Sequence, residues 1–315
     1  MSGSRSQRNE PLYRNGENVG ESRHTGRGAQ AYGGWSTGRV GRWTQRVSGG
    51  ASYAEDDYVP NPDNPAPPGA VPPSRTFAGP FLRYEVIEDN YLPVMNRNSI
   101  QRPEYLALGW RSNVQVGRSL ASFGATEEPW LLDASLSKGF RAGKGELLAS
   151  AGLSGQWGTQ TGDVRSVSMS ARYFAPQTRT FLLYFAGELA AVRTASAADE
   201  LLLGGDNGVR GYPARYQSGT RSAVFTFEER YYTDWYPFNL FRVGWAVYYD
   251  LGRAWGGQFR NDTPGWLSNV GFGLRILNAR ASFGNVVHID LAFPVHRTDG
   301  GIKARQLVVM TGATF

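Results

Sequence analysis

Some common structural devices are missing from this 315-residue sequence. It contains no cysteine, which excludes disulfide frameworks and thiolate metal sites. No apolar run reaches the roughly 18 residues that a membrane-spanning helix needs, since the best candidate, which begins at Phe181, is interrupted by Glu188. The first residues lack the apolar segment of a secretory signal peptide. These absences leave the compartment open, because they fit a bacterial envelope protein as well as a cytosolic one.

The sequence also lacks a large excess of charge of one sign, and recognisable catalytic motifs are scarce. The net charge of +6 is modest, and the 33 Lys and Arg residues are scattered along the chain, so nothing indicates a nucleic-acid partner. The segment at Gly152 lacks the second glycine of a nucleophile elbow, and the segment at Gly139 lacks the spacing of a phosphate-binding loop. The three histidines, His24, His288 and His296, are dispersed. We therefore expect no catalytic residue, no metal and no cofactor.

From Arg75 to Phe315 the sequence alternates with a period of two. Between Leu240 and Gly252, one face carries only apolar side chains, namely Phe241, Val243, Trp245, Val247, Tyr249 and Leu251. The other face carries small or polar residues, namely Arg242, Gly244, Ala246, Tyr248, Asp250 and Gly252. The pattern returns in earlier and later segments, and no helical period of comparable length is present. The sequence therefore predicts an all-β protein.

Three features favour a membrane barrel over a soluble β-sandwich. The alternating runs last about 9 to 13 residues, nearer to a tilted membrane-crossing strand than to an average soluble strand. Aromatic residues gather at a strand end between Tyr231 and Phe238, as in an interfacial girdle. The polar faces carry too many charges for a dry core, namely Arg242, Asp250, Arg275, His288 and Asp290. We predict an antiparallel transmembrane β-barrel of the outer-membrane type.

Composition divides the chain near Ser74. Residues 1–74 form a Gly- and Pro-rich N-terminal segment with weak strand signals, and its last part, from Tyr58, predicts an extended linker. Residues 75–315 form the predicted barrel, with a long loop at 193–220. Thirteen strands are predicted, near 27–36, 40–54, 76–88, 103–117, 130–141, 145–158, 163–175, 180–192, 221–232, 240–252, 266–277, 284–296 and 305–315.

The long loop contains the motif Val209, Arg210, Gly211 and Tyr212, which places one arginine among turn-forming glycines. Beyond the loop, Glu228 and Arg230 match an E-x-R pattern, and Tyr248, Asp250 and Gly252 match F-x-D-x-G with Tyr in place of Phe. From about Leu201 to Gly256 the chain resembles the bacterial surface antigen superfamily of BamA-, TamA- and FhaC-type outer-membrane barrels. The resemblance implies that the loop folds into the lumen, where its arginine pairs with acidic side chains of the next strands.

The strand pattern supports this pairing independently. If Phe225 and Phe227 face lipid, then Glu228 faces the lumen, and the same count places Asp250 there. Two lumenal carboxylates on neighbouring strands require a cation, and the planar guanidinium of Arg210 can bind a carboxylate bidentately. We predict a cluster of Arg210, Glu228 and Asp250. Its role is open between pinning the loop and taking a direct part in transport.

The chain stops in mid-pattern at Phe315, which resembles the terminal aromatic residue of outer-membrane barrels and predicts an assembly signal. Ala313 stands where a further aromatic residue is usual. The superfamily barrel has about sixteen strands, about five of them after the loop, and bacterial barrels are usually even-numbered. We therefore expect about 12 to 16 strands, with the family's first strands missing. We infer either the C-terminal part of a longer protein with upstream POTRA domains or a reduced member.

The resemblance implies a non-enzymatic barrel of the bacterial cell outer membrane that acts in outer-membrane protein assembly, insertion or protein translocation. Its partners would be outer-membrane lipid and lipopolysaccharide, together with unfolded outer-membrane or secreted proteins. Alternatives are a passive pore, a structural barrel, or the membrane anchor of an upstream passenger domain. A soluble ligand-binding β protein is a more distant alternative, and nucleic acid is not expected as a partner.

Overall fold

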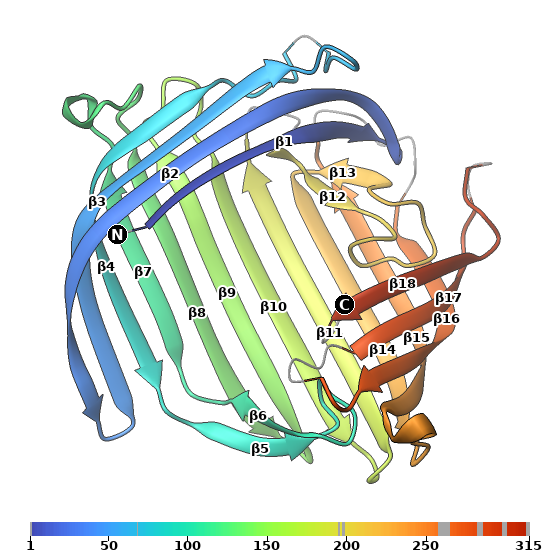
Figure 1. Ribbon diagram of the computed structural model, residues 1–315. Helices are drawn as coiled ribbons and strands as arrows, with labels where there is room; N and C mark the ends of the chain where they lie inside the picture. The colour runs from blue at the N-terminus through green and yellow to red at the C-terminus, as the bar shows by residue number, and fades with distance from the viewer. Residues whose placement is uncertain are drawn as a thin grey trace.

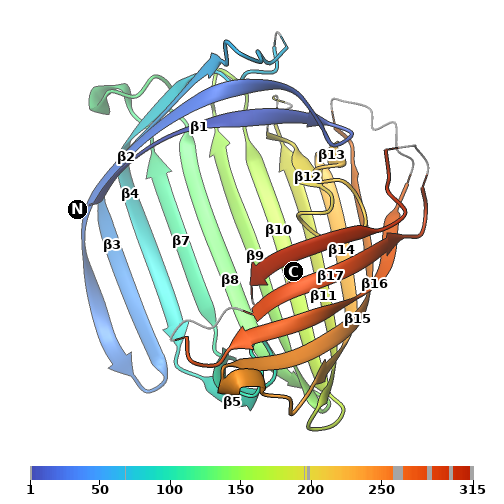
Figure 2. The ribbon, with the colours of Figure 1, turned by 45° about the vertical axis from the view of Figure 1, so that its right-hand side comes forward.

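In the part of the chain that the structure describes, fourteen antiparallel strands form one continuous sheet that curls around a lumen (Figures 1 and 2). The computed structural model describes residues 2–67, 69–194, 196, 199–257, 265–281, 286–297 and 301–312. The all-β class, the antiparallel order and the expected strand number are confirmed, and five strands of the sheet follow the long loop. Within the described ranges, no helix is long and apolar enough to cross a membrane.

The strands follow one another around the sheet nearly in chain order. Its first half consists of β1 (Ser2–Arg14), β2 (Glu17–Val40), β3 (Trp43–Pro60), β4 (Arg75–Glu88), β7 (Arg111–Arg118), β8 (Trp130–Ala142) and β9 (Gly145–Trp157). Its second half consists of β10 (Arg165–Pro176), β11 (Phe181–Arg193), β14 (Arg221–Tyr232), β15 (Phe241–Trp255), β16 (Leu267–Asn278), β17 (Val286–Pro294) and β18 (Gln306–Gly312). Two short hairpins stand outside this sheet, β5 (Tyr91–Met95) with β6 (Pro103–Ala107) and β12 (Leu201–Leu203) with β13 (Gln217–Gly219).

Residues 2–60 belong to the sheet, so the sheet begins well before the boundary expected at Ser74. The strand predicted at 27–36 lies inside the longer β2, and the one predicted at 40–54 begins at the end of β2 and covers the first part of β3. β1 was not predicted, because its sequence, SGSRSQRNEPLYR, has no apolar face for the alternation to reveal. The Pro-rich stretch at 61–74 connects β3 to β4, which fits the missing backbone N–H of proline.

The strand predicted at 103–117 is wrong, since the chain divides there into β6 and β7. β6 leaves the sheet to pair with β5, and β7 takes its place beside β4. Gly109 allows the chain to cross at this point, because a Cβ there would lie 2.0 Å from the carbonyl oxygen of Glu88. The sequence pattern that predicted one strand at 103–117 runs on through Gly109. It therefore did not reveal that the chain passes there from the β5–β6 hairpin to the main sheet.

Along β15 and β16, the wall of the sheet is apolar on its outer face and carries buried polar side chains on its inner face. On β16, Val270, Phe272 and Leu274 are 46 to 55% exposed, whereas Asn269 and Arg275 on the opposite face are at most 3% exposed. β15 repeats this arrangement, with Val247 exposed and Asp250 buried. A water-soluble sheet buries its apolar face and exposes its polar face. A barrel wall in lipid instead requires apolar side chains on the outside and polar side chains towards the lumen. The structure therefore agrees with the predicted membrane barrel and disfavours a sandwich.

The sheet has two edges in the described part of the chain, because β1 pairs only with β2 and β18 only with β17. Both edge strands lie on the same side of the barrel (Figures 1 and 2). The predicted last strand, 305–315, corresponds to β18 at 306–312. Phe315 and Ala313 lie outside the described residues, so the assembly signal stays a prediction.

Two chain segments enter the barrel from opposite ends. Adjacent strands run antiparallel, so a connection after β4 and a connection after β11 lie at opposite ends of the sheet. The connection after β11 carries the long loop with β12 and β13, and the connection after β4 carries the β5–β6 hairpin. Figure 1 places β12 and β13 near the upper end and β5 and β6 near the lower end.

Candidate functional site: a buried charge network at the loop tip

The long loop turns back on itself through local hydrogen bonds. β12 and β13 pair at its base, from Leu201 with Gly219 to Leu203 with Gln217. At the tip, the backbone N–H of Val209 donates to the carbonyl of Gly204 at 3.0 Å. Gly208 has a φ of +133°, a conformation that favours glycine. These contacts direct the side chain of Arg210, which follows Val209, into the barrel.

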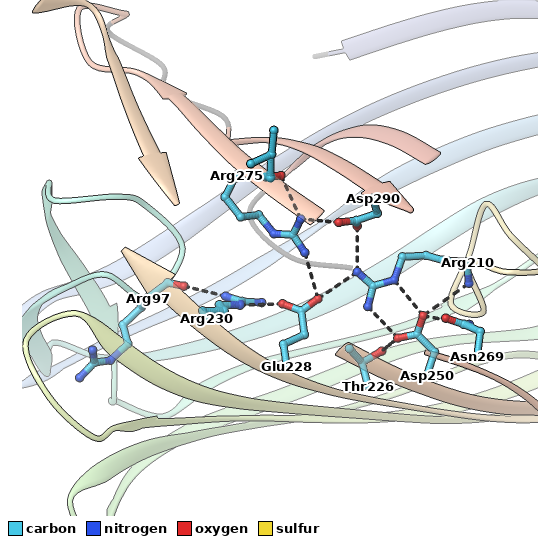
Figure 3. Close-up of polar contacts among 10 residues, drawn as sticks. Arg97, Arg210, Thr226, Glu228, Arg230, Asp250, Asn269, Arg275 and Asp290 are labelled. Carbon is cyan, nitrogen blue, oxygen red and sulfur yellow. Dashed lines mark hydrogen bonds and ion pairs between the residues drawn. The ribbon is translucent and has the colours of Figure 1, made fainter. Parts of the chain in front are cut away.

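Arg210 is fully buried and binds three carboxylates from three strands (Figure 3). Its Nε and Nη2 donate to the two oxygens of Asp250 on β15, at 2.8 and 2.7 Å. Its Nη1 donates to Glu228 on β14 at 3.0 Å and to Asp290 on β17 at 2.9 Å. The guanidinium carbon lies 3.3 Å from the centre of the Tyr248 ring, which adds a cation–π contact. Charge-assisted bidentate bonds of this kind fix orientation as well as adding stability.

Two further arginines complete the network. Arg230 donates from Nε to Glu228 at 2.7 Å. Arg275 on β16 donates to Asp290 and reaches Glu228 at 3.4 Å. Arg210, Arg230 and Arg275 thus face Glu228, Asp250 and Asp290, so three positive charges meet three negative ones. Such a balance is what permits charges to remain buried.

The surroundings of the cluster orient its carboxylates. Thr226 donates its hydroxyl to Asp250 at 3.1 Å, and the amide of Asn269 donates to the same carboxylate at 3.2 Å. Burial alone would lower the pKa of Arg210, but the paired carboxylates, Asp250 first among them, outweigh burial and raise that pKa. The loop arginine is therefore a permanent cation.

The other residues of the loop motif hold the loop against the barrel wall. Val209 and Tyr212 are fully buried. The hydroxyl of Tyr212 lies 3.1 Å from the carbonyl oxygen of Ser268 and 3.0 Å from that of His296. A Cβ on Gly211 would lie 2.9 Å from Asn269. The motif needs glycine there because the loop backbone contacts the wall directly.

The strand glycine of the second motif serves the same packing. A Cβ on Gly252 would lie 2.7 Å from a methyl group of Val209 and 3.1 Å from Leu203. The loop therefore lies against the inner face of β15 where that face lacks a side chain. This contact explains a glycine in the strand without any special backbone conformation.

The structure brings together the predicted Arg210, Glu228 and Asp250. It also places Arg230 and Tyr248 against this cluster. Asp290 and Arg275 were predicted only as members of polar strand faces, and the structure adds them to the network. Alternation reports which face a side chain lies on. Alternation does not predict at which height along the barrel axis the loop tip meets that face, so it could not show that Asp290 and Arg275 lie beside Arg210.

Comparisons with known proteins give fold neighbours only. No family model matches the sequence, and no curated protein matches it. CdiB from Escherichia coli has a similar structure, with a TM-score of 0.48 and 14% identity over 92% of this chain and 52% of CdiB. BamA from Haemophilus ducreyi lacking POTRA domains 1–3 has a TM-score of 0.47 and 12% identity, over 98% of this chain and 69% of that one. The chain thus spans about half the length of CdiB.

Proposed function

We propose that this chain is a non-enzymatic barrel of the bacterial outer membrane that acts in outer-membrane protein assembly, insertion or protein translocation. The observation that carries the proposal is the loop arginine inside the barrel, bound to carboxylates of β14, β15 and β17. The motifs that place these residues resemble those of the bacterial surface antigen superfamily. The apolar outer wall supports lipid as the surrounding medium.

The charge network acts by holding the loop, in this proposal, and not by touching a substrate. Arg210 has no exposed surface, and its partners Glu228 and Asp250 are at most 2% exposed. A buried ion network of this kind defines geometry, because removing one member leaves an unpaired charge in a dry site. The loop thereby joins β14, β15 and β17, which belong to the last five strands of the sheet before the β18 edge.

The two edge strands offer the means of handling protein substrates. β1 and β18 each have one neighbour in the described part of the sheet. An unpaired strand edge presents backbone donors and acceptors, and an extended peptide can add to it as a further strand. Unfolded outer-membrane or secreted proteins are the partners that suit such an edge. Outer-membrane lipid and lipopolysaccharide would contact the outer wall, and no nucleic-acid partner is proposed.

Reconstitution into lipid vesicles tests this function. We expect the purified barrel to speed the folding of an unfolded outer-membrane β-barrel substrate into those vesicles, followed by the gel shift of the folded form. Vesicles that contain an unrelated barrel of similar size are the control. An unchanged folding rate, with the chain properly inserted, would exclude an assembly role.

A passive pore or structural barrel is the second candidate, including a membrane anchor for an upstream passenger domain. The observation that favours it is the charge-balanced interior, in which the described arginines and carboxylates of the network form ion pairs with one another. The intact mass of the native protein from the outer-membrane fraction separates the two. Upstream POTRA domains would favour assembly or translocation, whereas a passenger domain, or a mass near 34.6 kDa, would favour the passive role.

A further inference from the structure

The β5–β6 hairpin carries an ordered tip, residues 96–102, at the end of the barrel opposite the long loop. The carboxylate of Glu104 accepts the backbone N–H groups of Arg97 at 2.7 Å and Asn98 at 3.1 Å. Asn96 and Gln101 have φ values of +61° and +50°, and the Asn96 side chain accepts the N–H of Gln101 at 2.6 Å. The tip therefore has a defined shape of its own.

The tip binds the barrel wall on several sides. Arg97 forms a bidentate pair with Glu146 of β9, at 2.7 and 3.2 Å, and both residues are buried. Gln101 donates to the carbonyl of Thr233, just beyond β14, at 2.8 Å. Arg102 donates to the carbonyl of Ala281, beyond β16, at 3.1 Å. The tip thus reaches strands that are far apart in the sheet.

An apolar anchor accompanies these polar contacts. Ile100 is 1% exposed and belongs to a buried cluster drawn from β10, β11, β14, β16 and β17. Its members are Phe174, Leu182, Tyr184, Ala186, Tyr232, Leu277 and Val286. Burial of the isoleucine removes its apolar surface from water, which stabilises the tip in this position. The hairpin is held in the lumen and is not a solvated surface turn.

Arg230 connects this hairpin to the charge network of the loop. Its Nη1 donates to the backbone carbonyl of Arg97 at 3.1 Å, while its Nε donates to Glu228 at 2.7 Å. Glu228 in turn accepts a hydrogen bond from Arg210 at 3.0 Å. Figure 3 shows Arg97, Arg230, Glu228 and Arg210 in this sequence of contacts. The two segments that enter from opposite ends therefore share one arginine–carboxylate link.

We propose that the β5–β6 hairpin is a second plug of the lumen, and that Arg230 couples its position to that of the Arg210 loop. β5 and β6 pair only with each other among the described strands, so the hairpin can leave without breaking the sheet. A cavity of about 740 Å³, lined by Asn96, Arg97 and Gln101 among others, borders the tip. This proposal holds for an assembly barrel and for a passive pore alike.

A cysteine probe measures whether the tip leaves its site. The chain has no cysteine of its own. The Ser99 hydroxyl is buried without a hydrogen-bond partner, so Ser99→Cys changes little and hides one thiol. In vesicles, a water-soluble maleimide should label this thiol slowly. Adding Arg97→Ala should speed labelling by about tenfold or more, because Glu146 then remains buried and unpaired.

Three companion variants separate plugging from general damage. Charge reversal of both partners, Arg97→Glu with Glu146→Arg, should restore slow labelling. Lys144→Ala, in the exposed β8–β9 turn at the same end, should leave labelling unchanged. If Arg97→Ala labels no faster than the parent, the plug is disproved. Ile100→Cys provides a second buried probe should Ser99→Cys not fold.

Separate measurements test the coupling between the hairpin and the loop and the closure of the lumen by the hairpin. With the Ser99→Cys probe, Arg230→Ala and Arg210→Ala should each speed labelling, although Arg210 itself does not contact the hairpin in the described bonds. Labelling that responds to Arg97→Ala but to neither of these would disprove the coupling. Replacing residues 96–102 by a short Gly-Ser turn should raise single-barrel conductance in planar bilayers, and unchanged conductance would disprove closure by the hairpin.

Discussion

The C-terminal strands β14 to β18 and the N-terminal strands β1 to β3 build one sheet in different ways. The C-terminal strands have a largely apolar outer face, on which Glu229 of β14 is an exception, and a lumenal face that carries the buried ion pairs of the charge network. In the N-terminal strands, ion pairs are exposed: Arg27 is 53% exposed in its pair with Glu55, and Arg8 is 67% exposed in its pair with Glu10. Exposed pairs contribute about 0 to 1 kcal/mol, so the two regions derive their stability from different sources.

The long loop accounts for the difference. Where it lies against the wall, water is excluded and each charge must find a partner. The loop meets the end of β1, where Arg215 lies over the Tyr13 ring, and the rest of β1 is mostly exposed. The exception is His24, which lies between Glu10 at 2.9 Å and Asp56 at 2.8 Å and connects the first three strands. Burial of polar groups in this barrel therefore follows the lumenal segments more than the strands themselves.

The largest expected effect comes from Arg210→Ala. Removal of the cation leaves Glu228, Asp250 and Asp290 with one partner fewer, which should lower the free energy of unfolding by about 3 to 5 kcal/mol. The loop should also become sensitive to protease between β12 and β13. Urea unfolding in vesicles and limited proteolysis measure both effects. Arg27→Ala in the N-terminal region is the matched control, expected to cost at most about 1 kcal/mol. Unchanged protease resistance in Arg210→Ala would refute loop pinning.

A charge placed on the outer wall tests where lipid begins. Phe272→Arg, in the middle of β16, should destabilise the folded barrel by about 2 to 4 kcal/mol in vesicles, because it puts a cation in hydrocarbon. Gln7→Arg on the polar β1 should change stability by less than about 0.5 kcal/mol. Equilibrium unfolding in vesicles gives both values. Equal costs at the two sites would mean that β1 lies in lipid, and the contrast between the regions would fail.

A smaller effect is expected where the loop touches β15. Gly252→Ala places a methyl group against Val209 and should cost about 1 to 3 kcal/mol. Combining it with Val209→Ala should give a cost below the sum of the two single variants. Gly33→Ala in β2, where nothing lies within 4 Å of the added carbon, is the control and should be tolerated. Additive costs would show that the loop does not rest on Gly252.

The smallest effect concerns the tyrosine of the loop motif. Tyr212→Phe removes the hydroxyl that contacts the carbonyls of Ser268 and His296, and should cost about 0.5 to 1.5 kcal/mol. Tyr32→Phe, on the exposed part of β2, should have no measurable effect on unfolding. An effect of Tyr212→Phe as large as that of Arg210→Ala would move the main anchor of the loop from the arginine to the tyrosine.

Much of the barrel wall could be predicted because alternation is a local property. The five strands after the loop and the lumenal direction of Glu228 and Asp250 follow from side chains two residues apart. β1 could not be predicted, since a polar edge strand has no apolar face. β5 was not predicted and β6 was predicted as part of a longer strand, because the departure of the hairpin from the sheet depends on Gly109 and on the tip contacts of Arg97 and Ile100.

Taken alone, the sequence determined the all-β class and the alternation of apolar and polar faces along the strands. It also determined the motif of the loop and two of the carboxylates that bind the loop arginine. Only the tertiary structure decided that Asp290 and Arg275 join the cluster and that Arg230 links the loop to a hairpin from the other end. The reason is physical. A strand's faces are set by backbone geometry every two residues, whereas the meeting of loop, hairpin and wall depends on register and curvature across the whole sheet.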